Sequence, residues 1–329
     1  MRPAHIRRRY RLVGRRKRSR APSKQEDVTL SNGIMRGNFP TLTSGRIQSE
    51  AVSSMKPQFD EIGYWSEIKL EILRRYASAY STILAGQTDP SLFHVYIDAF
   101  AGAGVHLSRS TGQEVPGSPL NALDVRPAFR EYHLIDISAD KVAGLRGLTK
   151  DRPDVHIYQG DCNQILIDTI FPNVQYNQYR RGLCILDPYG LDLEWKVIAT
   201  AGRMKTLDIF INFPVQDMNR NVLWHDPEKV EKAQVARMNS YWGDGSWRQA
   251  AYQTTRNLFG FPEKESNETI AEAFRKRLRE VAGFIRVPPP LPMRNSRGAT
   301  VYYLFFASQK DTAEHIVLQI FDKFRSRGE

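Results

Sequence analysis

The chain contains very little cysteine and no long apolar run. Only Cys162 and Cys184 occur among its 329 residues, and they do not form a C-x-x-C pair. The histidines show no cluster at metal-ligand spacing, so we expect no metal centre and no disulfide framework. A reducing cytoplasm fits this composition. No stretch approaches the ~18 consecutive apolar residues of a membrane-spanning helix, so we expect no membrane span.

The first 25 residues contain no acidic side chain. They hold eleven Lys or Arg, and the remaining 36 basic residues balance 36 acidic ones, so the net charge of +11 resides in this segment. Such a segment could be a disordered tail that neutralises nucleic-acid phosphates. Alternatively, residues 1–54 are a dispensable or mis-assigned leader, because Met35 and Met55 are also possible starts. The segment lacks the apolar stretch of a signal peptide.

From residue 55 to residue 329 the apolar pattern predicts one α/β domain. Residues 64–84 place apolar side chains at three- and four-residue steps, which indicates a helix. Short runs rich in β-branched and aromatic residues then recur at intervals that leave room for crossover helices: 94–97, 132–135, 155–158, 183–186 and 209–212. Continuous apolar runs are typical of strands covered on both faces. The pattern therefore predicts a Rossmann-like, mostly parallel sheet.

The C-terminal third predicts a hairpin and an insertion. Runs 284–287 and 301–306 have no helix-length segment between them, so we expect an antiparallel pair that brings the sheet to seven strands. A last helix is expected over 311–324. The stretch of about 215–278 is too long for a simple crossover and predicts a helical insertion beside the sheet's carboxyl edge.

A glycine-containing turn follows the first strand. Residues 98–104 read D-A-F-A-G-A-G, and we take Asp98, Ala99, Phe100, Gly102 and Gly104 as cofactor-binding candidates. Glycines let the chain bend sharply and let a ligand approach backbone N–H groups. The spacing is not the pyrophosphate fingerprint G-x-G-x-x-G.

Acidic residues end the next two strands. Asp136 is placed to accept hydrogen bonds from ribose hydroxyls, and Asp161 with Cys162 could bind the exocyclic amine of adenine. Taken together, these strand ends predict an adenosine-type ligand. Each acid could instead be solvated or could cap the following helix.

The fourth strand leads into Asp187, Pro188, Tyr189 and Gly190. In open α/β sheets the reactive crevice lies beside the first strand at this edge. A carboxylate and a proline-fixed carbonyl could accept the N–H groups of an amine, and Tyr189 could stack on a planar acceptor. Asn212, at the end of the fifth strand, is expected to line the acceptor pocket with Gly190. A plain tight turn is the alternative for the tetrapeptide, and capping of the insertion is the alternative for Asn212.

Four segments carry a resemblance to a known family. They are F-D-E-I-G-Y-W-S-E-I-K-L at 59–70, the turn at 98–104, G-S-P-L at 117–120 and L-D-P-Y-G at 186–190. With them, the chain from about residue 55 onward resembles the three-Cys-motif partner proteins (TcmP). The resemblance implies a bacterial protein with a class I methyltransferase-like fold, S-adenosylmethionine as cofactor, and a companion protein that carries a three-cysteine motif.

Two further likenesses concern the site. The turn at 98–104 is similar to the D-x-F-x-G-x-G of DNA and RNA methyltransferases, which implies that Phe100 packs on the cofactor. The tetrapeptide at 187–190 is closer to the Asp-Pro-Phe-Gly of tRNA guanine-N2 methyltransferases than to the Pro-Pro form of adenine and cytosine enzymes. We therefore expect a methyltransferase that acts on an amino group, with a base of RNA or DNA favoured. The alternative is a non-catalytic subunit that docks its companion.

Overall fold

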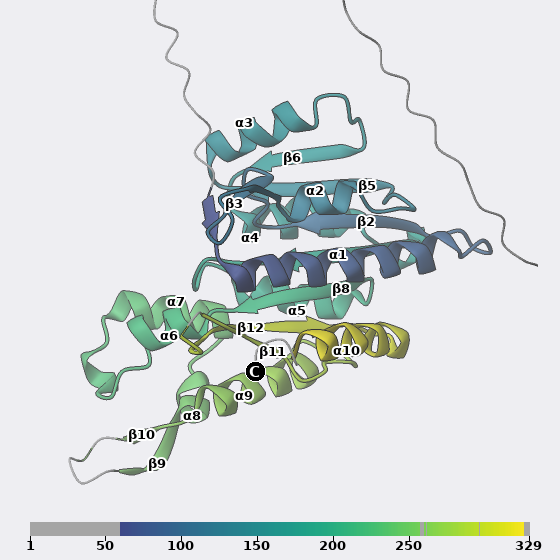
Figure 1. The fold of residues 1–329 in the computed structure, drawn as a ribbon. Coiled ribbons are helices and arrows are strands. Elements are labelled where there is room, and N and C mark those ends of the chain that lie inside the picture. The colour runs from purple at the N-terminus through teal and green to yellow at the C-terminus, as the bar shows by residue number, and fades with distance from the viewer. Residues whose placement is uncertain (1–59, 257–259, 261, 296, 326–329) are drawn as a thin grey trace, which may run out of the picture. The chain divides into compact units, whose positions relative to one another are not determined.

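The computed structural model describes residues 60–256, 260, 262–295 and 297–325; the predictions for residues 1–54 lie outside them. Seven strands form one sheet in the order β11-β12-β8-β7-β2-β5-β6 (Figure 1). They are β2 (Phe93–Asp98), β5 (Glu131–Asp136), β6 (Val155–Gln159), β7 (Arg180–Leu186), β8 (Leu207–Phe213), β11 (Leu291–Arg294) and β12 (Thr300–Ala307). The five strands from β8 to β6 are parallel, and β12 is antiparallel to both of its neighbours. The mostly parallel seven-stranded sheet is the one predicted.

Helices cover both faces of the sheet. One apolar cluster joins strand side chains such as Tyr96 and Phe210 to helices that include α1 (Tyr64–Ala85), α2 (Ser118–Leu123) and α10 (Asp311–Arg325). The alternate strand residues, such as Val95 and Ile97, join a second cluster with α5 (Trp195–Met204), α7 (Lys232–Trp242), α8 (Trp247–Ala251) and α9 (Asn267–Glu280). Burial on both faces explains why the strands read as continuous apolar runs. None of the described helices has both the length and the hydrophobicity needed to cross a bilayer.

The strand order reverses between β2 and β7. From β2 the chain first adds β5 and β6 on one side, and later adds β7 and β8 on the other. Such a switch point opens a crevice at the carboxyl ends of the two strands. Asp98 ends β2 and Asp187 directly follows β7, so the order of the strands brings both carboxylates to this crevice.

The first strand of the C-terminal hairpin was misplaced in the sequence analysis. Residues 284–287 form only an isolated bridge from Arg286 to Ser308, whereas β11 lies after the prolines, at 291–294. Prolines at 288–290 donate no ladder hydrogen bond, and Pro292 is tolerated in β11 because that strand is at the edge of the sheet. The second strand and the last helix match the expected 301–306 and 311–324 closely.

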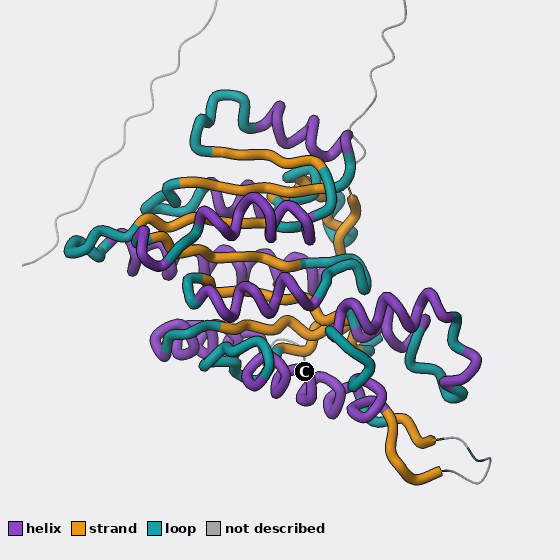
Figure 2. The backbone as a smooth tube through the Cα atoms, turned by 180° about the vertical axis from the view of Figure 1, so that it is seen from behind, coloured by secondary structure: helices purple, strands orange, loops and turns teal. Residues whose placement is uncertain are grey.

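The segment between β8 and β11 holds more than helices. It contains α6 (Val215–Asn221), α7, α8 and α9, and also an antiparallel ribbon of β9 (Tyr252–Arg256) and β10 (Pro262–Lys264). Figures 1 and 2 show α6, α7 and the ribbon extending beyond the carboxyl end of β8. Trp242 and Trp247 are buried in the cluster that backs the sheet, which anchors this segment.

A three-stranded sheet flanks the crevice. It is formed by β1 (Asp60–Ile62), β3 (Val105–Ser108) and β4 (Glu114–Pro116), and β1 runs parallel to β3. Since β3 follows the turn at 98–104, this pairing places Asp60 beside the crevice. These three strands were not predicted from the sequence.

Candidate functional site

Asp98 lies fully buried beneath the turn that follows β2. Its carboxylate accepts hydrogen bonds from the Phe100 N–H (3.3 Å) and the Tyr96 hydroxyl (3.2 Å). Burial raises the pKa of Asp98 to about 6, and the hydrogen bond from Ser118 opposes this shift. Asp98 thus holds the turn from below, whereas Phe100 lines the cavity above it.

Gly102 and Asp136 meet at the crevice. Gly102 has a φ of +66°, and its N–H donates to Asp136 Oδ2 (2.9 Å), while the Ser138 N–H donates to Oδ1 (2.8 Å). The N–H of Gly102 is therefore engaged within the protein and does not point at a ligand. Each carboxylate oxygen has a second lone pair, so Asp136 can still accept from a ribose hydroxyl. The ends of β2 and β5 converge as expected.

The remaining residues of the turn have packing roles. Ala99 is buried in the core, and its N–H donates to the Ile185 carbonyl (3.0 Å). Gly104 has a φ of +85°, and its carbonyl accepts from the Gly117 N–H at 2.7 Å. A Cβ on Gly117 would lie 3.0 Å from that carbonyl oxygen. The close approach joins the G-S-P-L segment, whose Ser118 begins α2, to the turn.

Asp161 caps a helix, and Cys162 packs in the core. Asp161 caps α4 (Cys162–Ile165), since its Oδ1 accepts from both the N–H and the side-chain amide of Asn163 at 2.9 Å. Cys162 is buried, and burial raises the pKa of its thiol to about 12. Neither residue lines the cavity described next.

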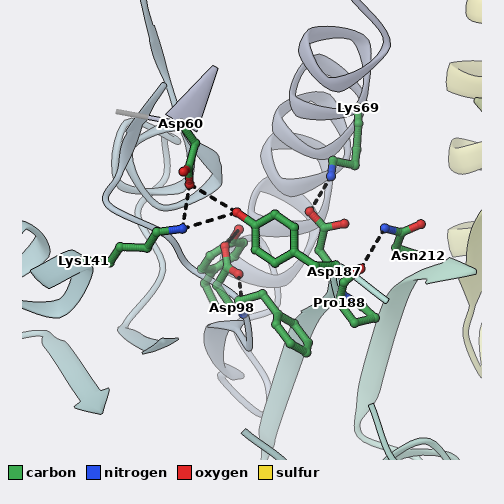
Figure 3. A network of polar contacts seen from close by, with 10 residues as sticks. Asp60, Lys69, Asp98, Lys141, Asp187, Pro188 and Asn212 are labelled. Atoms are coloured by element: carbon green, nitrogen blue, oxygen red, sulfur yellow. Dashed lines mark hydrogen bonds and ion pairs between the residues drawn. The ribbon is translucent and has the colours of Figure 1, made fainter. Parts of the chain in front are cut away.

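A cavity of about 240 Å³ opens at the switch point. Phe100, Ala101 and Gly102 of the turn form one wall, and Asp187, Pro188, Tyr189 and Asn212 form another. The predicted cofactor turn and the predicted acceptor residues therefore share one cavity, whose polar contacts are drawn in Figure 3.

Asp187 is paired with a lysine that sequence reasoning did not single out. Lys69, on α1, forms an ion pair with Asp187 Oδ2, and their side chains are 12% and 27% exposed. Burial lowers the pKa of Lys69, but the charge of Asp187, the hydrogen bond to it and the nearby Tyr302 together raise it by more, so the net pKa lies above the ordinary value. The amine is thus a fixed cation. Asp187 Oδ1 accepts no hydrogen bond from the described residues and remains available to a ligand.

The carbonyl of Pro188 is held by Asn212. The Asn212 side-chain amide donates to this carbonyl at 3.1 Å, and Asn212 Oδ1 is buried without a donor among the described residues. The carbonyl keeps one further lone pair. Asn212 lines the cavity and orients the Pro188 carbonyl.

Tyr189, which lines the cavity, and Gly190 also contact elements beside it. The ring of Tyr189 is 78% exposed; its hydroxyl donates to Asp60 (3.2 Å) and accepts from Lys141 (3.3 Å), and these two residues are themselves paired at 2.6 Å (Figure 3). Gly190 is buried against Asp217, whose Oδ2 would lie 2.9 Å from an added Cβ. Tyr189 thus forms a bridge between β1, α3 (Ala139–Leu148) and the loop after β7.

His106 is a second residue that the sequence analysis missed. It lines the cavity from β3, and its Nδ1 is buried without a partner in the described part of the chain. Burial lowers the pKa of its imidazole, and the charge of Lys69 lowers it further. No sequence signal marks His106. Lys69, by contrast, lies three, four and seven residues before buried side chains of α1, which places it on the buried face of that helix.

Comparisons with known proteins give structural matches only. No family model and no curated protein matches the chain. Solved structures match at low identity. Protein LPL1258 from Legionella pneumophila has 14% identity and a TM-score of 0.47, and the match covers 78% of this chain and 91% of that one. The N-methyltransferase NodS from Bradyrhizobium japonicum in complex with S-adenosyl-L-homocysteine has 10% identity, a TM-score of 0.37 and coverage of 75% and 89%, and the methyltransferase domain of bacterial CtHen1 has 10% identity, a TM-score of 0.35 and coverage of 72% and 99%. Because these TM-scores are below 0.5, the function of this chain is argued from its own residues. The resemblance to three-Cys-motif partner proteins stays a prediction.

Proposed function

We propose that the protein is an S-adenosylmethionine-dependent methyltransferase that acts on an amino group. The observation that carries the proposal is that the turn at 98–104 and Asp187 line one switch-point cavity, and that Asp136 accepts a hydrogen bond from Gly102 of that turn. The cofactor is a nucleoside with a sulfonium centre, and the residues present fit it. Asp136 retains lone pairs for ribose hydroxyls, and a Cβ at Gly102 would meet only His106, at 3.8 Å, so a ligand can approach closely there.

Asp187 and Pro188 would position the acceptor. When bound, the cofactor supplies an activated methyl group. Asp187 Oδ1 and the free lone pair of the Pro188 carbonyl would each accept one N–H of the amine and orient its nitrogen. Lys69 fixes the Asp187 carboxylate through their ion pair, and Asn212 fixes the carbonyl. Fixed orientation of this kind can contribute ~7–11 kcal/mol to catalysis in favourable cases.

Asp187→Asn tests the chemistry. The variant removes the charge that pairs with Lys69 and converts one acceptor oxygen into a donor. We expect turnover to fall by at least ~100-fold, while affinity for S-adenosylhomocysteine, measured by calorimetry, stays within about threefold. Asp192→Asn is the matched control, since Asp192 lies on the same loop with an exposed side chain paired to Arg237. Retained turnover in Asp187→Asn would remove this residue from the mechanism.

A non-catalytic role as the docking subunit of a three-cysteine companion is the second candidate. It is favoured because Asp187 Oδ2 already binds Lys69 and the Pro188 carbonyl already binds Asn212. Labelled methyl transfer to total RNA, DNA and the companion protein separates the two candidates. A chain that binds S-adenosylhomocysteine and transfers no label to any of the three would support the docking role.

A further inference from the structure

A second hollow of about 510 Å³ adjoins the cavity. Ser66 at the start of α1 and Tyr302 on β12 line both spaces. The hollow and the cavity that contains Asp187 therefore adjoin at these two residues. We call the two together the acceptor groove.

Aromatic side chains form one end of the acceptor groove. Tyr64 is 53% exposed, although it begins a helix whose other aromatic residues are largely buried. Trp65 meets it edge-on, with ring centroids 5.6 Å apart, and packs against the core. Trp65 thus fixes one side of Tyr64, and the rest of the Tyr64 ring faces solvent beside the hollow. A fixed, exposed ring of this kind can stack on a planar base.

The charge of the hollow is positive. Arg109 and Arg294 line it from two different elements, and no carboxylate does so among the described residues. Arg109 pairs with Glu61 at 3.5 Å, but both side chains are about two-thirds exposed. An exposed ion pair of this kind contributes little stability, so Arg109 can exchange Glu61 for a phosphate.

We propose that the acceptor groove binds single-stranded nucleic acid. One base stacks on Tyr64, phosphates lie against Arg109 and Arg294, and the adjacent base enters the cavity at Asp187. A base that stays stacked within a duplex cannot reach such a cavity, which is why a single strand is the expected form. The inference rests on the proposed methyl transfer, because it identifies the acceptor as a nucleobase amine.

Binding of a labelled oligonucleotide of about twelve nucleotides to the full chain tests the proposal, with RNA and DNA of one sequence as parallel arms. Tyr64→Ala should weaken binding about tenfold, and it should abolish the quenching of a 2-aminopurine base that stacks on the ring. Tyr64→Phe keeps the ring and should retain both. Arg109→Gln with Arg294→Gln should weaken binding further, and a duplex of the same sequence should bind more weakly than either strand.

Arg203→Gln is the matched control. Arg203 lies near the C-terminal end of α5, which the topology places at the opposite edge of the sheet, so its replacement should leave affinity unchanged. The proposal is wrong if the groove variants, folded by circular dichroism, bind within twofold of the unmodified protein or lose no more affinity than Arg203→Gln. A groove that instead docks a protein companion would give that result. Calorimetry with S-adenosylhomocysteine is independent of these variants, so failure of the groove and failure of the methyltransferase proposal are distinguishable.

Discussion

Two buried carboxyl groups contribute a loss of stability as the pH rises. Burial raises the pKa of Asp98 and of Asp208 to about 6 each, and Asp208 accepts hydrogen bonds from Tyr76 and Ser308. In the unfolded chain an aspartate titrates near ~3.9. Because the folded-state values are higher, the native state binds more protons between pH 4 and 6. The stability that these groups contribute is complete below about pH 4 and is lost as the pH rises through 6.

Asp98→Asn should reduce this loss. The amide cannot ionise, so the variant should lose about 2–3 kcal/mol less unfolding free energy than the unmodified protein between pH 4 and pH 8. Urea unfolding at a series of pH values measures the difference. Asp208→Asn is the matched comparison and should have an effect of similar size, because the two sites are more than 100 residues apart and share no hydrogen bond. A pH profile that Asp98→Asn leaves unchanged would contradict the raised pKa.

At the scale of the element, two helical glycines should respond to alanine with opposite signs. A Cβ on Gly202 in α5 would lie 2.0 Å from the carbonyl oxygen of Ala282, whereas a Cβ on Gly147 in α3 would meet nothing within 4 Å. We expect Gly202→Ala to lower the unfolding free energy by about 1–3 kcal/mol through overpacking. Gly147→Ala should raise it by about 0.5–1 kcal/mol. Urea unfolding of the pair is the measurement, and equal shifts would disprove the close approach of α5 to Ala282.

The bridge of Tyr189, Lys141 and Asp60 joins three elements across the crevice. Tyr189 follows β7 and Lys141 follows β5, and β2 with its glycine turn lies between these strands. We expect a cofactor that binds along these strand ends to enter past this bridge. Partial burial raises the pKa of Asp60, but the hydrogen bond and charge of Lys141 lower it by more. The ion pair within the bridge is therefore charged at neutral pH.

Tyr189→Phe should loosen the bridge without unfolding the protein. It removes two hydrogen bonds of an exposed hydroxyl and leaves the ion pair between Lys141 and Asp60 intact. Stability should change by less than about 1 kcal/mol, while the association rate of S-adenosylhomocysteine in stopped flow should rise severalfold, as for a loosened lid. Tyr176→Phe, at another exposed tyrosine, is the control. Equal association rates in all three proteins would show that the bridge does not limit entry.

Strand ends could be predicted from the sequence because burial on both faces leaves a continuous apolar run. That pattern located β2, β5 and β7, and with them Asp98, Asp136 and Asp187. The edge strand β11 could not be found in this way, since its four residues alternate between buried and half-buried and include a proline. A more apolar run lies before it and is not a strand.

The partners of the site residues could not be predicted from the sequence, for a different reason. Lys69 and Asp60 meet the site only because α1 and β1 dock beside strands that follow much later in the chain: 118 residues separate Lys69 from Asp187, and 129 separate Asp60 from Tyr189. Spacing along the sequence carries no record of such contacts. Asp161 caps α4 through Asn163, which was one of the open alternatives, and its contact with an adenine amine stays a prediction.

Across the whole molecule, the net positive charge and the residues of the candidate site lie in different parts of the chain. Residues 1–25 carry eleven positive charges and no negative one, and the rest of the chain is formally neutral. Sequence-independent affinity for a polyanion should therefore come mainly from these residues, through release of counterions. The acceptor groove, with two arginines, should contribute mainly the stacking that selects a single strand.

The contributions of residues 1–25 and of the acceptor groove should be distinguishable by how binding depends on salt concentration. The slope of log affinity against log salt is about −0.7 for each phosphate neutralised on a single strand. Deletion of residues 1–25 should make this slope shallower by several units, because up to eleven cationic contacts are removed. Tyr64→Ala should lower affinity by a similar factor at every salt concentration and leave the slope unchanged, because a stacked ring releases no counterion. Oligonucleotide titrations of the two variants across a salt series would contradict this division if the deletion left the slope intact or if Tyr64→Ala altered it.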